Sequence, residues 1–588
     1  MAQNFLRSLN PFPKASIITY PHPGVLVPLA QARRHPLVEA EYARRRSLEA
    51  RQTGSTSEGV RTESDASVKD KSGREESGAL PESMLCAYTV EGLKAEVLED
   101  IGSGESTVVS SYDLKSKVIN KAIQDIGMSR YQWELFFLCG FGWFADNLWL
   151  QGVAVTLPAL SKDFGISDKQ ARYTTCSLFV GLCIGASFWG IGSDIMGRRL
   201  AFNATLFIAG VFGIAAGAAP NWIGVCGLFA ALGTGVGGNL PVDGALFLEF
   251  LPGANGGLLT LLSVFWPIGQ LVASLLAWAF LGSNYPADQG WRYLVYTMGA
   301  LTFVMFLARF ALFTLYESPK FLLSRGRQAE AVAVVHAIAY KNKTTTWLTE
   351  EIMNEIGGDL AVVSDDKLTT GQIVRRKLSS FSAERIRPLF QTRKLGITTA
   401  LIWFCWLTIG LGYPLFNSFL PQYLAAGHGS SGQVISTYET YRNYAITSVV
   451  GLPGSVLACY TVDIPYVGRK GTMALATMLS GIFLFLFTTS ASSNSQLAFS
   501  AVEAFFQNIM YGVLYAYTPE IFPARNRGTG TGIASFLNRL GGLCAPIIAA
   551  NIPGANPNAP VFVSGALILA AFLAMVCLPV ETRGLQML

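Results

Sequence analysis

From about residue 129 onward, long apolar stretches of the chain alternate with short polar ones. A helix needs about 20 mostly apolar residues to cross the ~30 Å hydrocarbon core of a bilayer, and each stretch approaches or exceeds that length. The pattern predicts twelve transmembrane helices in two groups of six, separated by a longer polar segment. The predicted spans are 133–158, 174–193, 200–219, 222–247, 258–282 and 292–314, then 396–424, 443–461, 472–491, 496–518, 530–552 and 560–579.

The polar parts divide the chain into four segments. The N-terminal segment (1–128) has no apolar run of spanning length and is rich in Ser, Glu, Lys and Arg, so we predict that it is largely disordered. It ends in a surface helix whose apolar face comprises Val118, Ile119, Ala122, Ile123 and Ile126. The segments are an N-terminal cytoplasmic region (1–128), a six-helix bundle (129–317), a cytoplasmic linker with short helices (318–394) and a second six-helix bundle (395–588).

Composition also indicates an all-α polytopic membrane protein. Of 588 residues, 51% are hydrophobic and 14% are charged, whereas about a quarter of the residues of a soluble protein are charged. The net charge of +5 is too small to indicate nucleic-acid binding. The nine cysteines lie mostly inside apolar runs, without the spacing of a metal site, so neither a metal nor a cofactor is expected.

Basic residues gather in the loops at one end of the predicted spans. By the positive-inside rule these loops face the cytosol, which places both termini and the linker there. We expect the plasma membrane as the location, with an internal membrane as the alternative. The basic residues on this side are Arg198, Arg199, Lys320, Arg325, Arg327, Arg375, Arg376, Lys377, Arg393, Lys394, Arg469, Lys470, Arg525 and Arg527.

The loop GIGSDIMGRR joins the second and third predicted spans. Gly190 is predicted to let two helix backbones approach closely, and Asp194 to cap or pair at a helix end. A tight basic turn is the simpler interpretation. The order Gly-x-x-x-Asp-x-x-Gly-Arg-Arg, however, resembles the signature loop of the major facilitator superfamily. That resemblance implies gating roles for Gly190, Asp194, Gly197, Arg198 and Arg199.

The second half repeats these motifs six spans later. DIPYVGRK is a degenerate copy of the first loop, with two extra residues after Asp463. EFLP after the fourth span corresponds to PEIFPARNRG after the tenth, as expected of two fused bundles. Glu249 is expected to pair with Arg198 or Arg199. The further gating residues are Glu249, Glu317, Asp463, Gly468, Arg469, Glu520, Arg525 and Arg527.

Further motifs narrow the resemblance. YESPKFLLSRGR and LPVETRG resemble segments of the sugar porters, whereas IGMSRYQWELFF, GVGGNLPV and SFLNRLGGLCAP resemble the synaptic-vesicle-protein and organic-ion-transporter branch. Two features depart from that branch. The arginine typical of its fourth span is absent near Phe229, and GANGG replaces the basic residues that usually follow Glu249. The second departure predicts a weaker inner gate.

Ionisable residues inside the spans are candidates for function, because one at a helix centre costs about 2.5–3.5 kcal/mol. Asp146 lies in the middle of the first span, with Asn147 and Gln151 on the same polar face. In the resembling families a carboxylate here takes part in proton coupling or cation binding. A purely structural ion pair with a neighbouring helix is the alternative.

Arg539, in the eleventh span, is the most informative cation. Its guanidinium can bind a carboxylate bidentately, act as counter-ion to Asp146 or Glu503, or extend to the cytosolic edge. Asp243 follows Pro241, which is predicted to interrupt the fourth helix and line a cavity. Arg309 is expected to extend its charged end to the membrane edge. Further candidates for substrate or proton binding are Asp243, Gln270, Tyr413, Asn417 and Glu503.

These features predict a secondary transporter of a small polar solute, either an organic anion such as a carboxylate or a sugar. We expect proton symport through Asp146, alternating access and a monomer in the bilayer. Uniport or export remains an alternative, as does a nutrient sensor of the same fold. An enzyme is not expected, because the four histidines lie outside the predicted spans and no catalytic group or nucleotide-binding loop is recognisable.

Overall fold

In the computed structural model of the protein, helices account for nearly all of the regular structure that is described. One backbone bridge, between Leu26 and Thr346, is the exception within that part of the chain. The described residues are 24–32, 89–101, 111–252, 257–282, 285–311, 313–358, 386–425, 436–461, 468–490, 492–522, 527–552 and 558–581.

Each of the twelve predicted spans coincides with one helix or with a broken pair of helices. The first half contains α5 (Arg130–Phe164), α6 (Asp168–Met196), α7 (Arg198–Gly217), α8 (Trp222–Phe250), α9 (Gly257–Leu262), α10 (Phe265–Leu281) and α11 (Ala287–Ala311). The second half contains α17 (Arg393–Asn417), α18 (Leu420–Ala425), α19 (Thr437–Thr461), α20 (Gly468–Thr488), α21 (Ser493–Ile521), α22 (Arg527–Asn551) and α23 (Ala559–Val576).

Among the described residues, nine of these helices are long and apolar enough to cross a membrane. They are α6, α7, α8, α11, α17, α20, α21, α22 and α23. The α10 helix is apolar but shorter. The α5 and α19 helices are not among these nine. Both contain polar residues, including Asp146 and Asn147 in α5 and the segment TYETYRNY at the start of α19.

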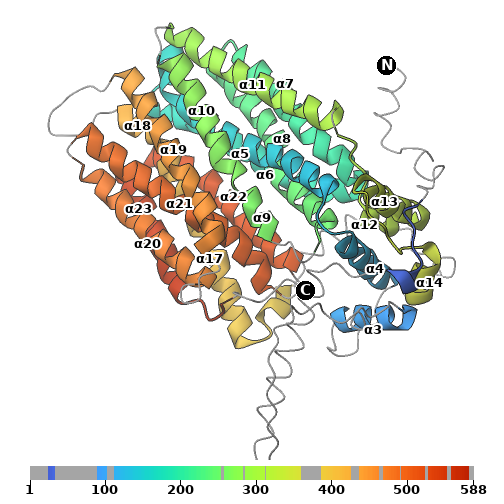
Figure 1. The fold of residues 1–588 in the computed structure, drawn as a ribbon. Helices are drawn as coiled ribbons and strands as arrows, with labels where there is room; N and C mark the ends of the chain where they lie inside the picture. Colours follow the sequence, from blue (N-terminus) through green and yellow to red (C-terminus); the bar gives the residue numbers. More distant parts are fainter. Residues whose placement is uncertain are drawn as a thin grey trace, which may run out of the picture.

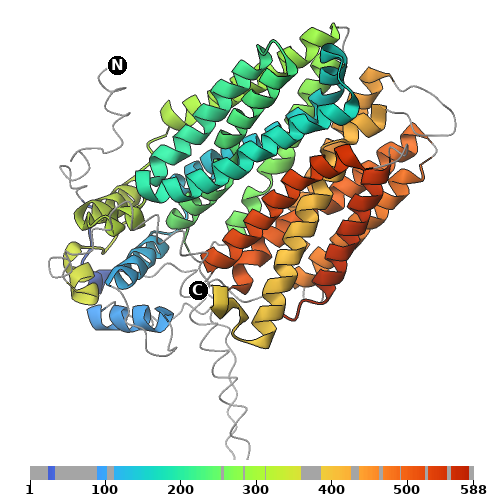
Figure 2. The same ribbon diagram turned by 180° about the vertical axis from the view of Figure 1, so that it is seen from behind.

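The two halves form two helix bundles that lie side by side (Figures 1 and 2). Within the first bundle α6 packs on α8, α7 on α8 and α11, and α5 on α10. Within the second, α19 packs on α21, α17 on α22 and α20 on both α21 and α23. The bundles meet mainly where α6 contacts α22 and α10 contacts α19.

Close helix packing in the first bundle depends on glycines of α6 and α8. A Cβ added at Gly181 or Gly185 would collide with backbone of α8, and one added at Gly233 or Gly237 would collide with backbone of α6. The predicted close approach at Gly190 is wrong, because nothing that the structure describes lies within 4 Å of a Cβ built there. The contact is made about one and a half to two and a half turns earlier along α6, at Gly185 and Gly181.

Short helices form a separate unit at one end of the first bundle (Figure 1). The unit comprises α3 (Val90–Ile101), α4 (Ser111–Ile126), α12 (Pro319–Ser324), α13 (Gln328–Lys341), α14 (Glu350–Gly357) and the 3-10 turn η1 (Leu29–Gln31). A further 3-10 turn, η5 (Arg387–Phe390), packs against α17. The disorder predicted for 1–128 falls mostly outside the described residues.

The predicted helix at the end of this region is confirmed as α4, and its apolar face is buried. That face contacts α12, α13 and α14 rather than lying free at a surface. The fully buried Lys115 ammonium donates to Gln328 Oε1 at 2.7 Å and to Asn354 Oδ1 at 2.8 Å. Segments from before the first bundle and from after it are therefore joined in one folded unit.

Candidate functional site

Asp146 lies on α5, close to the place where the two bundles meet, and its side chain is buried. Arg539 of α22 is near enough to exert a charge–charge attraction on it. The indole N–H of Trp266 lies beside the carboxylate without forming a hydrogen bond of acceptable geometry with any described group. The neighbouring Asn147 donates to the Trp266 carbonyl at 3.1 Å. A carboxylate and a guanidinium from opposite bundles are thus brought together.

Arg539 bridges the bundles through backbone carbonyls. Its Nη1 and Nη2 atoms donate to Leu182 O on α6 and Gly237 O on α8, at 3.3 and 3.2 Å. A guanidinium has five N–H donors, so donors are left over beyond these two contacts. The side chain is half-buried. It can therefore hold the bundles in register while still accepting a carboxylate ligand.

A cluster of aromatic rings, here called the aromatic cluster, lies beside Asp146 and Arg539. Trp143 and Trp266 have ring centroids 4.7 Å apart, and Tyr515 lies 4.7 Å from Trp266 and 4.7 Å from Trp406. Tyr511 joins the cluster through Trp266 and Tyr413. The members, from α5, α10, α17 and α21, are Trp143, Trp266, Trp406, Tyr413, Tyr511 and Tyr515.

Within the described residues, the buried indole N–H of Trp143 has no hydrogen-bond partner, whereas that of Trp266 lies beside the Asp146 carboxylate. A buried donor without an acceptor costs about 1–3 kcal/mol, so the Trp143 N–H favours a site that receives an acceptor. A solute with carboxylate or hydroxyl oxygens would supply one. The rings offer flat apolar faces beside it.

Four members of the cluster were not identified from sequence: Trp143, Trp406, Tyr511 and Tyr515. A signal was present on α21, where Glu503, Gln507, Tyr511 and Tyr515 recur every fourth residue. Residues four apart share one face of a helix. That periodicity marks a polar stripe running through an otherwise apolar segment.

Asp243 and Arg309 form an ion pair between α8 and α11, with both side chains fully buried. The Arg309 guanidinium also donates to Leu138 O at 2.9 Å and to Phe202 O at 2.7 Å. The prediction that Arg309 extends to the membrane edge is therefore wrong, because the carboxylate and two carbonyls satisfy it inside the bundle. The α8 helix also continues unbroken through Pro241, contrary to the predicted interruption.

The remaining candidates from sequence lie in the second bundle or on α5 and α10 of the first bundle. Glu503 is 1% exposed, so its carboxyl group lies inside the protein. Asn417 donates to Gln507 Oε1 at 3.0 Å, which joins α17 to the stripe on α21. Gln151 and Gln270 are buried, and Gln151 Nε2 has no partner among the described groups.

The gating motifs meet at one end of the bundles, here called the motif end. Glu317 accepts the Arg198 N–H at 2.9 Å and the Arg199 N–H at 3.4 Å, at the start of α7. Arg198 pairs with Glu249 at 3.3 Å, as predicted. Gly197 has φ +103°, which a residue with a side chain rarely adopts, and a Cβ there would collide with Glu317.

The second bundle repeats this arrangement at the start of α20. Glu581 accepts the Arg469 and Lys470 N–H groups, each at 3.0 Å, and Gly468 has φ +60°. Arg469 pairs with Glu520. Glu581 was not predicted to take part. Asp463 and Arg525 lie outside the described residues, so their predicted gating roles stay predictions. The same holds for Asp194 and Arg527, whose side chains are not described.

Burial changes two titratable groups at the motif end. Desolvation raises the pKa of the Glu317 carboxyl above its usual value, although the N–H groups of Ser318, Arg198 and Arg199 act in the opposite direction. Desolvation lowers the pKa of Lys320, against the attraction of Glu249. The Glu317 carboxyl consequently takes up a proton more readily than an exposed glutamate does.

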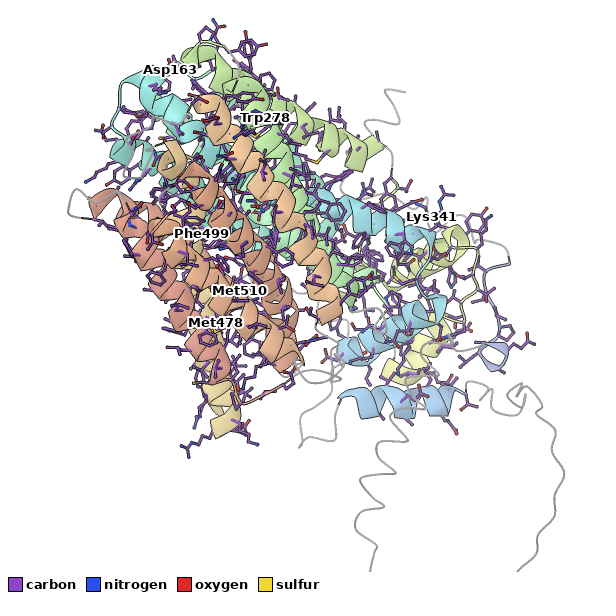
Figure 3. The ribbon with its side chains drawn as sticks, turned by 60° about the vertical axis from the view of Figure 1, so that its left-hand side comes forward. Asp163, Trp278, Lys341, Met478, Phe499 and Met510 are labelled. Carbon is purple, nitrogen blue, oxygen red and sulfur yellow. The ribbon has the colours of Figure 1, made fainter. Side chains whose placement is uncertain are left out.

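The bundles also contact each other at the opposite end, where α5 turns into α6. Arg172 donates to Ala549 O at 2.6 Å and to Gln422 Oε1 at 3.1 Å, and it lies over the Phe419 ring at 5.1 Å. The Tyr441 hydroxyl donates to Val155 O at 2.9 Å. Asp163 marks this end in Figure 3, and Lys341 the motif end. Side chains thus join the two bundles at the end opposite the motifs.

In the described ranges, no group of three or more His, Cys, Asp and Glu residues could hold a metal ion. The chain matches the sequence model of a family described as Major Facilitator Superfamily, over residues 135–465 and 402–586. It is 45% identical over 487 residues to a protein of Ceriporiopsis subvermispora named MFS siderochrome iron transporter 1, covering 80% of this chain and 92% of the relative.

A more distant relative, the niacin transporter NiaP of Acinetobacter baylyi, is 28% identical over 465 residues, covering 79% of this chain and 97% of the relative. Among solved structures, the inward open conformation of the xylose transporter XylE from E. coli is similar, with a TM-score of 0.57. That similarity, at 17% identity, covers 78% of this chain and 98% of the solved chain and concerns the fold alone.

Proposed function

The chain belongs to the major facilitator superfamily, and on this premise we propose that it moves a small organic anion together with a proton. Its family and relatives are transporters rather than enzymes. In the proposed mechanism two six-helix bundles expose one site to each side of the membrane in turn. The α5, α10 and α19 helices complete the twelve spans in this proposal.

The observation that carries the proposal is that Asp146 and Arg539, one from each bundle, lie within electrostatic range of each other across the bundle interface. A substrate carboxylate that binds Arg539 competes with Asp146 for the same positive charge. Asp146 then takes up a proton more readily, because it has lost its counter-charge. Substrate and proton are thereby bound together, as symport requires.

Two further observations favour a carboxylate over a sugar. The remaining N–H donors of Arg539 match a planar carboxylate, and the indole N–H of Trp143, which has no partner among the described groups, adds one more. The relative from Acinetobacter baylyi is named a niacin transporter, and niacin is a carboxylate with a flat ring. A sugar has no charge to displace Asp146 from Arg539.

The proposed orientation places the motif end in the cytosol, with both termini, in the plasma membrane. It is supported by the basic residues gathered at that end, among them Arg198, Arg199 and Arg469. The contacts of Arg172 then close the outer side of the site.

The test uses purified full-length protein in liposomes that contain a pH-sensitive dye. Mono- and dicarboxylates, sugars, polyols, phosphate and organic cations are added in turn. We expect carboxylates alone to drive proton entry, and Asp146→Asn to abolish that entry. Asp163→Asn is the matched control, because it changes the same helix at its far end, where Asp163 contacts Trp291 and Arg292.

Arg539→Lys tests the substrate class separately. It should raise the substrate concentration for half-maximal uptake by at least about tenfold, the effect of losing one charge-assisted hydrogen bond. Carboxylate uptake without proton movement, unchanged in Asp146→Asn, would establish a uniporter instead. Binding without flux would favour a sensor, and proton entry with sugars alone would overturn the choice of a carboxylate.

A further inference from the structure

Glu503 is a buried carboxyl group without a counter-ion in the part of the chain that the structure describes. It lies on α21 with 1% of its surface exposed. The Ser480 hydroxyl of α20 donates to its Oε1 atom at 3.2 Å. Its Oε2 atom has no hydrogen-bond partner among the described groups. Among the described groups, the Ser480 hydroxyl is therefore the one hydrogen-bond partner of the Glu503 carboxyl.

The titratable groups that face Glu503 are phenols. Tyr413 of α17, Tyr444 of α19 and Tyr511 of α21 lie within electrostatic range. The α20 helix contributes Ser480, and α9 contains no titratable residue. The charged Arg539 of α22 acts on Asp146 and Tyr515 instead. No described cation therefore compensates a negative charge on Glu503.

Burying an unpaired carboxylate costs several kcal/mol, so such a group takes up a proton instead. Asp243 differs in this respect, because Arg309 neutralises it. Glu503 consequently holds a proton in the present conformation. Its proton can be released once the bundles move and water or a cation reaches the Oε2 atom.

Glu503 also lies on the same face of α21 as Tyr515, which borders the proposed substrate site. It begins the stripe that continues through Gln507 and Tyr511 to Tyr515, and Tyr515 packs on Trp266 beside Asp146. Tyr413 lies within electrostatic range of both Glu503 and Asp146. The two carboxyls, one in each bundle, therefore both lie within electrostatic range of the same tyrosine.

We propose that Glu503 is a second proton-binding site, so that two protons accompany each substrate. The inference rests on the proposed proton symport and adds its stoichiometry. In each cycle one proton binds the Asp146 carboxylate and one the Glu503 carboxylate, and both leave on the other side. A monocarboxylate that carries two protons moves one net positive charge, so a membrane potential drives its accumulation.

The test measures protons and labelled substrate entering the same proteoliposomes. We expect two protons per substrate in the wild-type protein and one in Glu503→Gln. For a monocarboxylate, an inside-negative potential of about 59 mV should raise wild-type accumulation about tenfold and leave that of Glu503→Gln unchanged. Glu439→Gln is the control, since Glu439 is exposed at the start of α19.

The outcomes separate the two proposals. No proton movement in the wild-type protein would overturn the proposed symport itself. One proton per substrate in the wild-type protein, or two in Glu503→Gln, would overturn only the role of Glu503. Exchange of labelled for unlabelled substrate, which needs no net proton movement, should persist in Glu503→Gln and shows that the variant is folded.

A second variant keeps the carboxyl and removes its hydrogen-bond donor. The hydroxyl of Ser480 favours the charged form of Glu503, so Ser480→Ala should let the proton bind at higher pH. Two-proton transport should then persist to higher pH than in the wild-type protein. Ser500→Ala is the matched control, because Ser500 is equally buried but contacts Thr447. Identical pH profiles for the two serine variants would contradict the proposal.

Discussion

Asp243 Oδ2 and Arg309 Nη2 lie 2.5 Å apart, in an ion pair that is wholly buried inside the first bundle. The same guanidinium binds carbonyl groups of α5 and α7, so one side chain connects four helices. Nothing comparable crosses to the second bundle at this place in the described residues. The pair therefore ties four helices of the first bundle to one another.

Removing one partner of this pair should destabilise the protein severely. Asp243→Asn leaves the Arg309 guanidinium buried without a counter-charge, which costs about 3–5 kcal/mol. Unfolding in detergent, followed by tryptophan fluorescence, should begin at a clearly lower temperature. The double variant Asp243→Leu, Arg309→Met should lose less stability than Asp243→Asn alone. A larger loss in the double variant would contradict this account.

Glycines of α6 should differ sharply in their tolerance of a side chain. In Gly185→Ala the new Cβ meets the backbone of Thr234, and overpacking of this kind costs about 1–3 kcal/mol. Gly190→Ala should be neutral or should stabilise by up to about 1 kcal/mol, because alanine favours helix and the position is open. Thermal unfolding of the two variants compares them directly.

Arg172 should control how tightly the bundles close at the end opposite the motifs. Arg172→Ala removes its bonds to Gln422 and Ala549 and its contact with Phe419. Spin labels at Ile223 and Asn494, one on each bundle, should then report longer distances between the bundles. Arg292→Ala is the control, because Arg292 binds carbonyl groups of its own bundle only. Unchanged distances in Arg172→Ala would show that other contacts close this end.

Glu317 should make stability depend on pH in a defined direction. Its pKa is raised in the folded protein by burial, so the folded state binds more protons than the unfolded state between the ordinary and the raised pKa. The stability of the wild-type protein relative to Glu317→Gln should therefore fall as the pH rises through that window and stay constant outside it. Unfolding midpoints of both proteins across a pH series measure the difference. A difference that grows with pH would contradict the stated sign.

The helices could be predicted from sequence because span-length apolar runs have few alternatives. Each predicted span coincides with a helix or a broken pair of helices, and Arg198 is one of the two partners that were predicted for Glu249. The repeated motifs also predicted two equivalent halves. The contacts of Glu317 with Arg198 and of Glu581 with Arg469 are equivalent in this sense. Local spacing was sufficient for these features.

Contacts between distant spans could not be predicted in the same way. Arg309 and Asp243 are 66 positions apart, so no local spacing indicated that they form a pair. Arg309 was therefore expected at the membrane edge. The close contact expected at Gly190 lies at Gly181 and Gly185, because the crossing point of two helices depends on their tilt. The aromatic cluster likewise combines four helices, and no single segment reveals it.

The paired arrangement at the motif end has a consequence for how the chain can be divided. Glu317 holds the start of α7, and Glu581 holds the start of α20, so each half secures its own helix ends. The short helices of the linker up to Gly358 pack on the first half, whereas η5 packs on the second. Fragments 1–358 and 386–588, synthesised as separate polypeptides, should therefore find each other in the membrane and reassemble.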